Sequence, residues 1–178
     1  MTRLRDRGDV MRFTTKQLTL CALLAALALA LSYVEGMFPA PLPLPGVKLG
    51  LANIVTLFAL CALGAPYALA ILLVRVLLGA MFAGNASALL YSLLGGLAAL
   101  GVMALLVRAK RLSVYGVSIG GAAAHQCGQV AAAIVTLGSL APLAYLPALL
   151  VVSVFTGALT GFVTGMLLGN RFLKNVAE

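Results

Sequence analysis

The chain has 178 residues, of which 63% are hydrophobic and 9% are charged, with a mean hydropathy of +1.13. Soluble domains are about half apolar and about a quarter charged, so this composition excludes an ordinary soluble protein and is typical of an integral membrane protein. The net charge of +8 does not indicate nucleic-acid binding, because the basic residues flank apolar runs instead of forming a stripe among polar ones. We therefore expect a single domain in a lipid bilayer, with no nucleic acid among its partners.

Glycine, proline and charged residues divide the chain into six apolar stretches. A transmembrane helix needs about 17–25 such residues. The stretches are Gln17–Phe38, Val47–Leu63, Pro66–Phe82, Ser87–Val107, Leu112–Leu137 and Leu143–Gly169. The first is longer than the apolar part of a signal peptide, about 7–15 residues, so we interpret it as a retained helix. The sequence thus predicts an all-α integral membrane protein with six transmembrane helices.

The positions of the basic residues predict the orientation. Ten of the twelve fall in three clusters. The clusters are Arg3, Arg5, Arg7, Arg12 and Lys16; Arg108, Lys110 and Arg111; and Arg171 and Lys174. Six spans with both ends in the cytoplasm place all ten inside, as the positive-inside rule requires. We predict a transmembrane domain over residues 17–170 between cytoplasmic tails 1–16 and 171–178.

The first outer loop, residues 39–46, has proline at every second position from 39 to 45. Alternating proline favours an extended polyproline II conformation. The loop is either a stiff connector or a lid across the outer mouth of the protein.

Small residues recur every four positions on two of the predicted helices. Gly157, Gly161 and Gly165 share one face of the last helix, and Ala22, Ala26 and Ala30 share one face of the first. Such spacing permits close helix packing. The alanine stripe packs either inside this protein or against a helix of a partner.

Seven polar residues lie from the middle of the predicted membrane region outward. They are Glu35, Lys48, Asn53, Arg75, Asn85, His125 and Gln129. Polar groups that merely join helices should show no such bias in depth, and ionisable groups inside a membrane usually mark function. We predict that these residues line an outward-open pocket for a small molecule that is anionic or rich in electrons.

Each of these residues also has a structural interpretation. Arg75 can pair with Glu35, and His125 can serve helix packing alone. Asn85 can cap the following helix, and Lys48 can extend to the outer headgroups. A common depth favours the pocket, because none of these alternatives predicts it.

The residues do not indicate an enzyme, a metal site or a cofactor. Outside the N-terminal tail the chain has no Asp, so it lacks the acidic cluster that binds Mg²⁺ in diphosphate chemistry. It also lacks a Walker A motif. Its three cysteines are isolated from one another, which argues against a zinc or redox pair.

Four segments resemble one bacterial family. They are Pro45–Thr56, Arg75–Gly79, Tyr91–Gly96 and Gly121–Gln126. The family is that of heptaprenyl diphosphate synthase component I, also called the Gx transporter family, and the resemblance covers about residues 15–172. It implies a multi-pass protein of the bacterial cytoplasmic membrane.

That family is similar in turn to the substrate-binding S components of energy-coupling factor (ECF) importers. The similarity implies a six-helix bundle that binds its substrate beneath a loop after the first helix. It also implies that a stripe such as Ala22, Ala26 and Ala30 docks on a transmembrane coupling subunit. Separate ATPase subunits would supply the energy for import. The main hypothesis is therefore a substrate-binding importer subunit. The alternative is a non-catalytic accessory subunit of isoprenoid or menaquinone synthesis, or of extracellular electron transfer.

The predicted topology can be tested by cysteine labelling in intact cells. Single cysteines at Leu42, Ala86 and Ser139, in a background without the native cysteines, should react with an impermeant maleimide. Cysteines at Thr2, Ala109 and Asn175 should react only after the membrane is opened. Labelling at Ala109 from outside would contradict the six-span orientation.

Overall fold

A computed structural model describes residues 15–37, 48–109 and 112–169 of the chain. The predicted tails lie mostly outside these ranges, as do the proline-rich loop 39–46 and the basic residues Lys110 and Arg111. The described part contains six α-helices and one short 3₁₀ helix. They are α1 (Thr15–Met37), α2 (Asn53–Ala62), α3 (Ala65–Ala83), α4 (Ala86–Ala109), α5 (Val114–Leu137), η1 (Ala141–Tyr145) and α6 (Leu146–Gly169).

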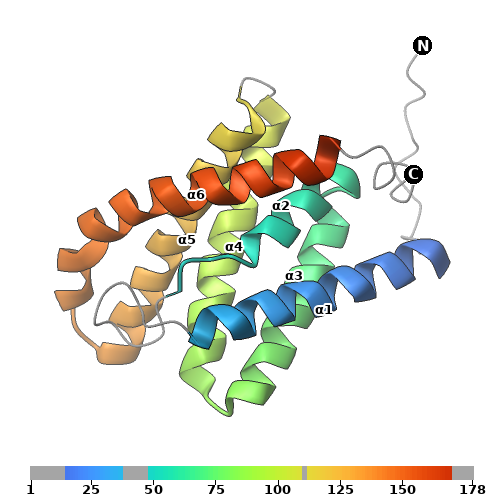
Figure 1. Cartoon of the computed structure of the whole chain (residues 1–178). Helices are drawn as coiled ribbons and strands as arrows, with labels where there is room; N and C mark the ends of the chain where they lie inside the picture. The colour runs from blue at the N-terminus through green and yellow to red at the C-terminus, as the bar shows by residue number, and fades with distance from the viewer. Residues whose placement is uncertain (1–14, 38–47, 110–111, 170–178) are drawn as a thin grey trace, which may run out of the picture.

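The helices form two layers. In Figure 1, α1 and α6 run across α3, α4 and α5, and the short α2 lies between α1 and α6. Helix α2 contacts all five other α-helices, and each of its residues from Asn53 to Leu60 is buried. The shortest α-helix therefore occupies the centre of the bundle.

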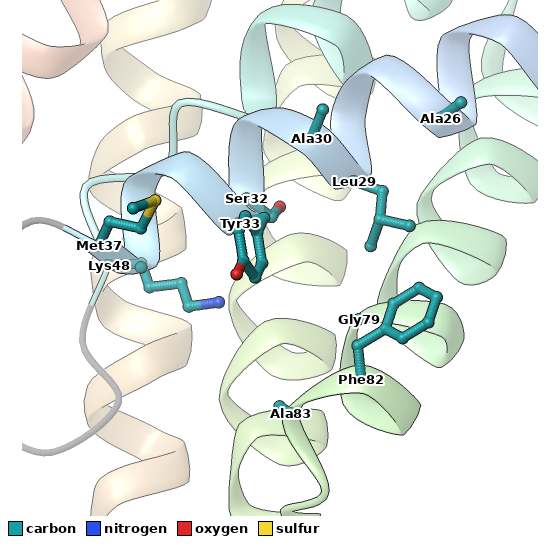
Figure 2. Close-up of a pocket in the computed structure, with 11 residues that line it drawn as sticks. Ala26, Leu29, Ala30, Ser32, Tyr33, Met37, Lys48, Gly79, Phe82 and Ala83 are labelled. Atoms are coloured by element: carbon teal, nitrogen blue, oxygen red, sulfur yellow. The ribbon is translucent and has the colours of Figure 1, made fainter.

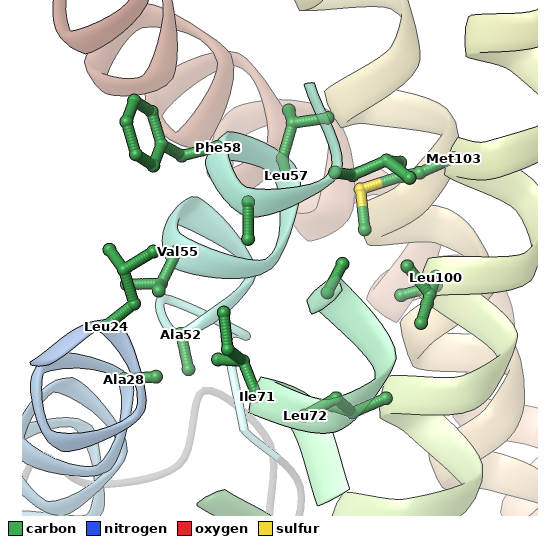
Figure 3. Close-up of a cluster of buried hydrophobic side chains, with 14 of the residues drawn as sticks. Leu24, Ala28, Ala52, Val55, Leu57, Phe58, Ile71, Leu72, Leu100 and Met103 are labelled. Carbon is green, nitrogen blue, oxygen red and sulfur yellow. The ribbon is translucent and has the colours of Figure 1, made fainter. Parts of the chain in front are cut away.

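The main apolar core surrounds α2. Figure 3 shows Val55, Leu57 and Phe58 of α2 among side chains of α1, α3 and α4. Their neighbours include Leu24, Ala28, Ile71, Leu72, Leu100 and Met103. In a bilayer, close packing of the helices would stabilise such a core more than the exclusion of water, because lipid is as apolar as these side chains.

Glycines set the distances between α4, α5 and α6. A Cβ atom on Gly128 of α5 would lie 2.5 Å from the backbone oxygen of Leu94 in α4. A Cβ atom on Gly157 of α6 would lie 2.6 Å from Cα of Ile119 in α5, whereas one on Gly165 would meet no atom within 4 Å. The glycine stripe of the last helix thus packs internally at Gly157 but not at Gly165.

Five of the six predicted stretches are helices over nearly all of their length, with bounds within about three residues of the predicted ones. The exception is Val47–Leu63, because Lys48–Ala52 are not helical and α2 begins only at Asn53. At ~1.5 Å per residue the ten residues of α2 reach about half of the ~30 Å hydrocarbon thickness. The prediction of a second full transmembrane helix was wrong.

Four helical segments of the described residues are long and apolar enough to cross a membrane: α1, α3, α4 and the η1–α6 segment Ala141–Gly169. Helix α5 has 24 residues but is not one of the four. Its middle carries His125, Gln126 and Gln129, all of them buried in the bundle.

Candidate functional site

The non-helical segment Lys48–Ala52 lies inside the bundle, where its backbone groups need partners other than water. The Gly50 and Leu51 amides donate to the two carboxylate oxygens of Glu35, at 2.5 and 3.1 Å. The Glu35 carboxylate of α1 thus holds the start of the α2 region.

Helix α5 satisfies the other end of the same segment. The Lys48 amide donates to Oε1 of Gln129 at 3.2 Å, and Nε2 of Gln126 donates to the Lys48 carbonyl at 3.3 Å. The two glutamines are 0% and 1% exposed. Side chains of α1 and α5 therefore replace the helical hydrogen bonds that this segment lacks.

His125 and Asn53 pack against the turn of this segment. Gly50 has a φ of 88°, a conformation that glycine adopts without steric cost. A Cβ atom here would lie 2.9 Å from Nδ2 of Asn53 and 3.3 Å from Cδ2 of His125. On the other side of the imidazole, a Cβ atom on Gly95 would lie 3.0 Å from Nδ1. Glycines on two elements thus make room for one buried histidine.

Arg75 of α3 lies between α1 and α4. Its Nη1 donates to Oγ of Ser32 in α1 at 3.1 Å, and a Cβ atom on Gly96 would lie 3.3 Å from its Nη2. The side chain is 6% exposed, and Nε and Nη2 have no hydrogen-bond partner in the described part of the chain.

Unpartnered polar atoms gather in this region of the bundle. Besides those of Arg75, they include both amide atoms of Asn53, Nδ1 of His125 and Oε1 of Gln126. Buried polar atoms are nearly always hydrogen-bonded in native proteins. The exceptions here mark a region that can accept a ligand or water.

A groove of about 830 Å³ lies between α1 and α3, next to Arg75. Its walls are mostly apolar and include Ala26, Leu29 and Ala30 of α1 and Gly79, Phe82 and Ala83 of α3. In Figure 2, Ser32, Tyr33 and Lys48 lie together at one end of it. The groove is therefore amphiphilic, with a long apolar part and a cationic, hydroxylated end.

The structure brings together six of the seven residues predicted to line a pocket. Glu35, Asn53, Arg75, His125 and Gln129 lie around the Lys48–Ala52 segment, to which Lys48 itself belongs. Of these six residues only Lys48 lines the groove. Asn85 lies apart in the exposed turn before α4, where its Oδ1 accepts from the Ser87 amide at 2.8 Å. This is the helix-capping interaction that the sequence offered as its alternative.

The sequence analysis missed Ser32, the residue that joins the groove to Arg75. A signal was present, because Ser32 lies three residues before Glu35 and so shares its helix face. A serine within a long apolar helix is common, however, and gives no reason to single it out.

The alanine stripe of α1 is exposed, and two of its residues, Ala26 and Ala30, line the groove between α1 and α3. Ala22, Ala26 and Ala30 are exposed, whereas Cys21, Leu24, Ala25 and Ala28 are the buried side of the helix. Of the two interpretations of the stripe, the structure does not show internal packing.

The described residues contain no group of three or more His, Cys, Asp or Glu side chains that could hold a metal ion. Glu35 is their only acidic residue, and both of its oxygens accept backbone hydrogen bonds.

The family model described as heptaprenyl diphosphate synthase component I matches residues 24–167. The match confirms the resemblance that the sequence motifs indicate. No curated protein and no solved structure matches the chain.

Glu35→Ala tests the anchoring of the Lys48–Ala52 segment. The substitution leaves two buried amides without acceptors, at a cost of about 1–3 kcal/mol each, so the melting temperature in detergent should fall by several degrees. Glu35→Gln keeps one acceptor oxygen and should have a smaller effect. Thr19→Ala on the same helix removes only an exposed hydroxyl that bonds to Thr15 and serves as the control. Equal melting temperatures for Glu35→Ala and Thr19→Ala would contradict the anchoring role.

Proposed function

Because the chain belongs to the heptaprenyl diphosphate synthase component I family, we propose that it is a non-catalytic membrane subunit that binds an isoprenoid chain. The amphiphilic groove between α1 and α3 supports this proposal most directly. The bound isoprenoid would be presented to a separately encoded synthase subunit.

The size and lining of the groove suit such a ligand. Small-molecule sites enclose about 300–1,000 Å³ and are mostly apolar, with a few polar groups that fix orientation. The groove has a volume of about 830 Å³, and its alanine and glycine residues leave much of the wall smooth. An isoprenoid chain is long, apolar and flexible, so it can follow such a wall.

The acidic residues support a non-catalytic role. Synthesis of a prenyl diphosphate needs carboxylates that hold Mg²⁺ at the diphosphate. In the described part of the chain Glu35 is the single carboxylate, and it is engaged with Gly50 and Leu51. The chemistry therefore belongs to the partner.

The location proposed for the protein is the bacterial cytoplasmic membrane. Four apolar helices long enough to span a bilayer support it, as does the clustering of basic residues that predicts cytoplasmic termini.

Filling part of the groove should weaken binding of the isoprenoid chain. Gly79→Leu places a side chain in the groove opposite Leu29, whereas Gly101→Leu adds the same side chain where a Cβ atom meets nothing within 4 Å. If two methylenes of the ligand are displaced, affinity falls roughly tenfold. The measurement is photolabelling of the protein in nanodiscs by a photoreactive isoprenoid alcohol. Equal labelling of the two variants, or no labelling of the unmodified protein, would contradict the proposed function.

A second function is favoured by the exposed alanine stripe of α1. Residues Ala22, Ala26 and Ala30 form a smooth exposed strip, which suits close approach by a partner helix. The groove would then receive a small molecule from outside the cell, and the stripe would dock on the coupling subunit of an ECF-type importer with separate ATPase subunits.

Ala22→Trp distinguishes the two functions, since Ala22 is exposed and, unlike Ala26 and Ala30, does not line the groove. If the stripe docks on a coupling subunit, the variant should remain folded and bind its ligand, but fail to co-purify with that subunit. Leu23→Trp, at a neighbouring position that is also exposed, is the control. Co-purification of the unmodified chain with a prenyl synthase alone, unaffected by Ala22→Trp, would contradict the importer.

A further inference from the structure

The polar end of the groove contains two cationic side chains and one carboxylate. Lys48 lines the groove, Arg75 lies directly behind its wall, and Glu35 interacts electrostatically with both. The Glu35 oxygens are already occupied by the Gly50 and Leu51 amides. Among the described residues, two cationic side chains thus share one carboxylate here. An uncompensated charge is costly in an apolar region, so this end of the groove suits an anion.

Ser32 connects the buried cation to the groove. Its Oγ accepts from Nη1 of Arg75, and the residue also lines the groove. Since the oxygen accepts from a guanidinium, the hydroxyl proton is directed elsewhere and can be donated to a ligand. Arg75 thus polarises a hydroxyl donor at the groove wall while its own charge remains buried.

We propose that Lys48 and Ser32 bind the phosphate head group of a phosphorylated isoprenoid whose chain lies in the α1–α3 groove. Arg75 is a positioning residue that acts through the Ser32 hydroxyl. This inference rests on the proposed function and adds to it the charge and chemistry of the ligand.

The placement of Lys48 makes it a clean position for the test. The structural hydrogen bonds of Lys48 come from its backbone, through the Gln126 and Gln129 side chains. A change of its side chain therefore leaves the anchoring of the segment in place. The side chain itself is only half-buried, at the groove.

The experiment measures competition against the photoreactive isoprenoid alcohol, with the full-length protein in nanodiscs of phosphatidylcholine. The competitors are geranylgeranyl diphosphate, geranylgeraniol and phosphatidylglycerol. A hydrogen bond to a charged group changes affinity roughly 10- to 100-fold, so the diphosphate should compete better than the alcohol by about this factor.

Substitutions test whether the preference for the diphosphate arises at the polar end of the groove. Within each variant the preference is the ratio of competition by the diphosphate to competition by the alcohol. Lys48→Gln should remove most of this preference, whereas Lys48→Arg should retain it. Ser32→Ala should reduce the preference in part. Arg108→Gln, which removes an exposed cation at the end of α4, should have no effect.

Three results would overturn the inference. The first is equal competition by diphosphate and alcohol, and the second is an unchanged preference in Lys48→Gln. The third is equal competition by phosphatidylglycerol and the diphosphate, which would assign the site to membrane lipid. In each case labelling by the alcohol itself still supports the groove, whereas its absence from the unmodified protein would reject the proposed function.

Discussion

The constraint on which this structure depends is that every backbone amide and carbonyl in an apolar interior needs a partner. Lys48–Ala52 enter the middle of the bundle without helical hydrogen bonds. In a membrane, irregular backbone is tolerated only where protein or a water-lined cavity satisfies it. Here the backbone groups bond to side chains of α1 and α5, namely Glu35, Gln126 and Gln129. The same bonds fix the start of α2, and the position of α2 fixes the core.

This constraint divides the buried polar residues into two groups. Glu35, Gln126 and Gln129 bond to the backbone and maintain the fold, so their depth in the membrane region does not by itself indicate a ligand. Lys48 and Ser32 present their side chains at the groove. A polar residue inside an apolar bundle therefore has to be judged by the partner that it already has.

The helices were predictable because their ends are marked in the sequence. The turn between α2 and α3 follows from Gly64 and Pro66, with Gly64 at a φ of 102° and the proline in the first turn of α3. The non-helical conformation of Lys48–Ala52 was not predicted, because the segment runs without a break into the apolar stretch that follows it and Gly50 alone does not mark a helix end. Its conformation is decided by hydrogen-bond acceptors that are distant in the sequence.

The sequence predicted that several polar residues lie close together, but of the residues that line the groove it predicted only Lys48 as a ligand contact. Depth in the membrane brought Arg75, His125 and Lys48 into one group, as the structure has them. The depth of a residue does not tell in which direction its side chain points. It therefore placed Asn85 in the same group as the other residues, and it did not indicate the groove. That groove depends on how far α1 stands from α3, which is set by packing along both helices.

The polar middle of α5 has a consequence for how the chain reaches its native state in a bilayer. A helix centred on His125, Gln126 and Gln129 gains little by entering lipid alone, since polar residues at the centre of a span oppose its insertion. The partner of both glutamines is the Lys48 backbone, which is synthesised some eighty residues earlier. If α5 enters a bilayer, its insertion would be coupled to assembly, because the early segment would have to be in place before the late helix exchanges its hydration for those bonds. Two glutamines would then set an order on the biogenesis of this protein.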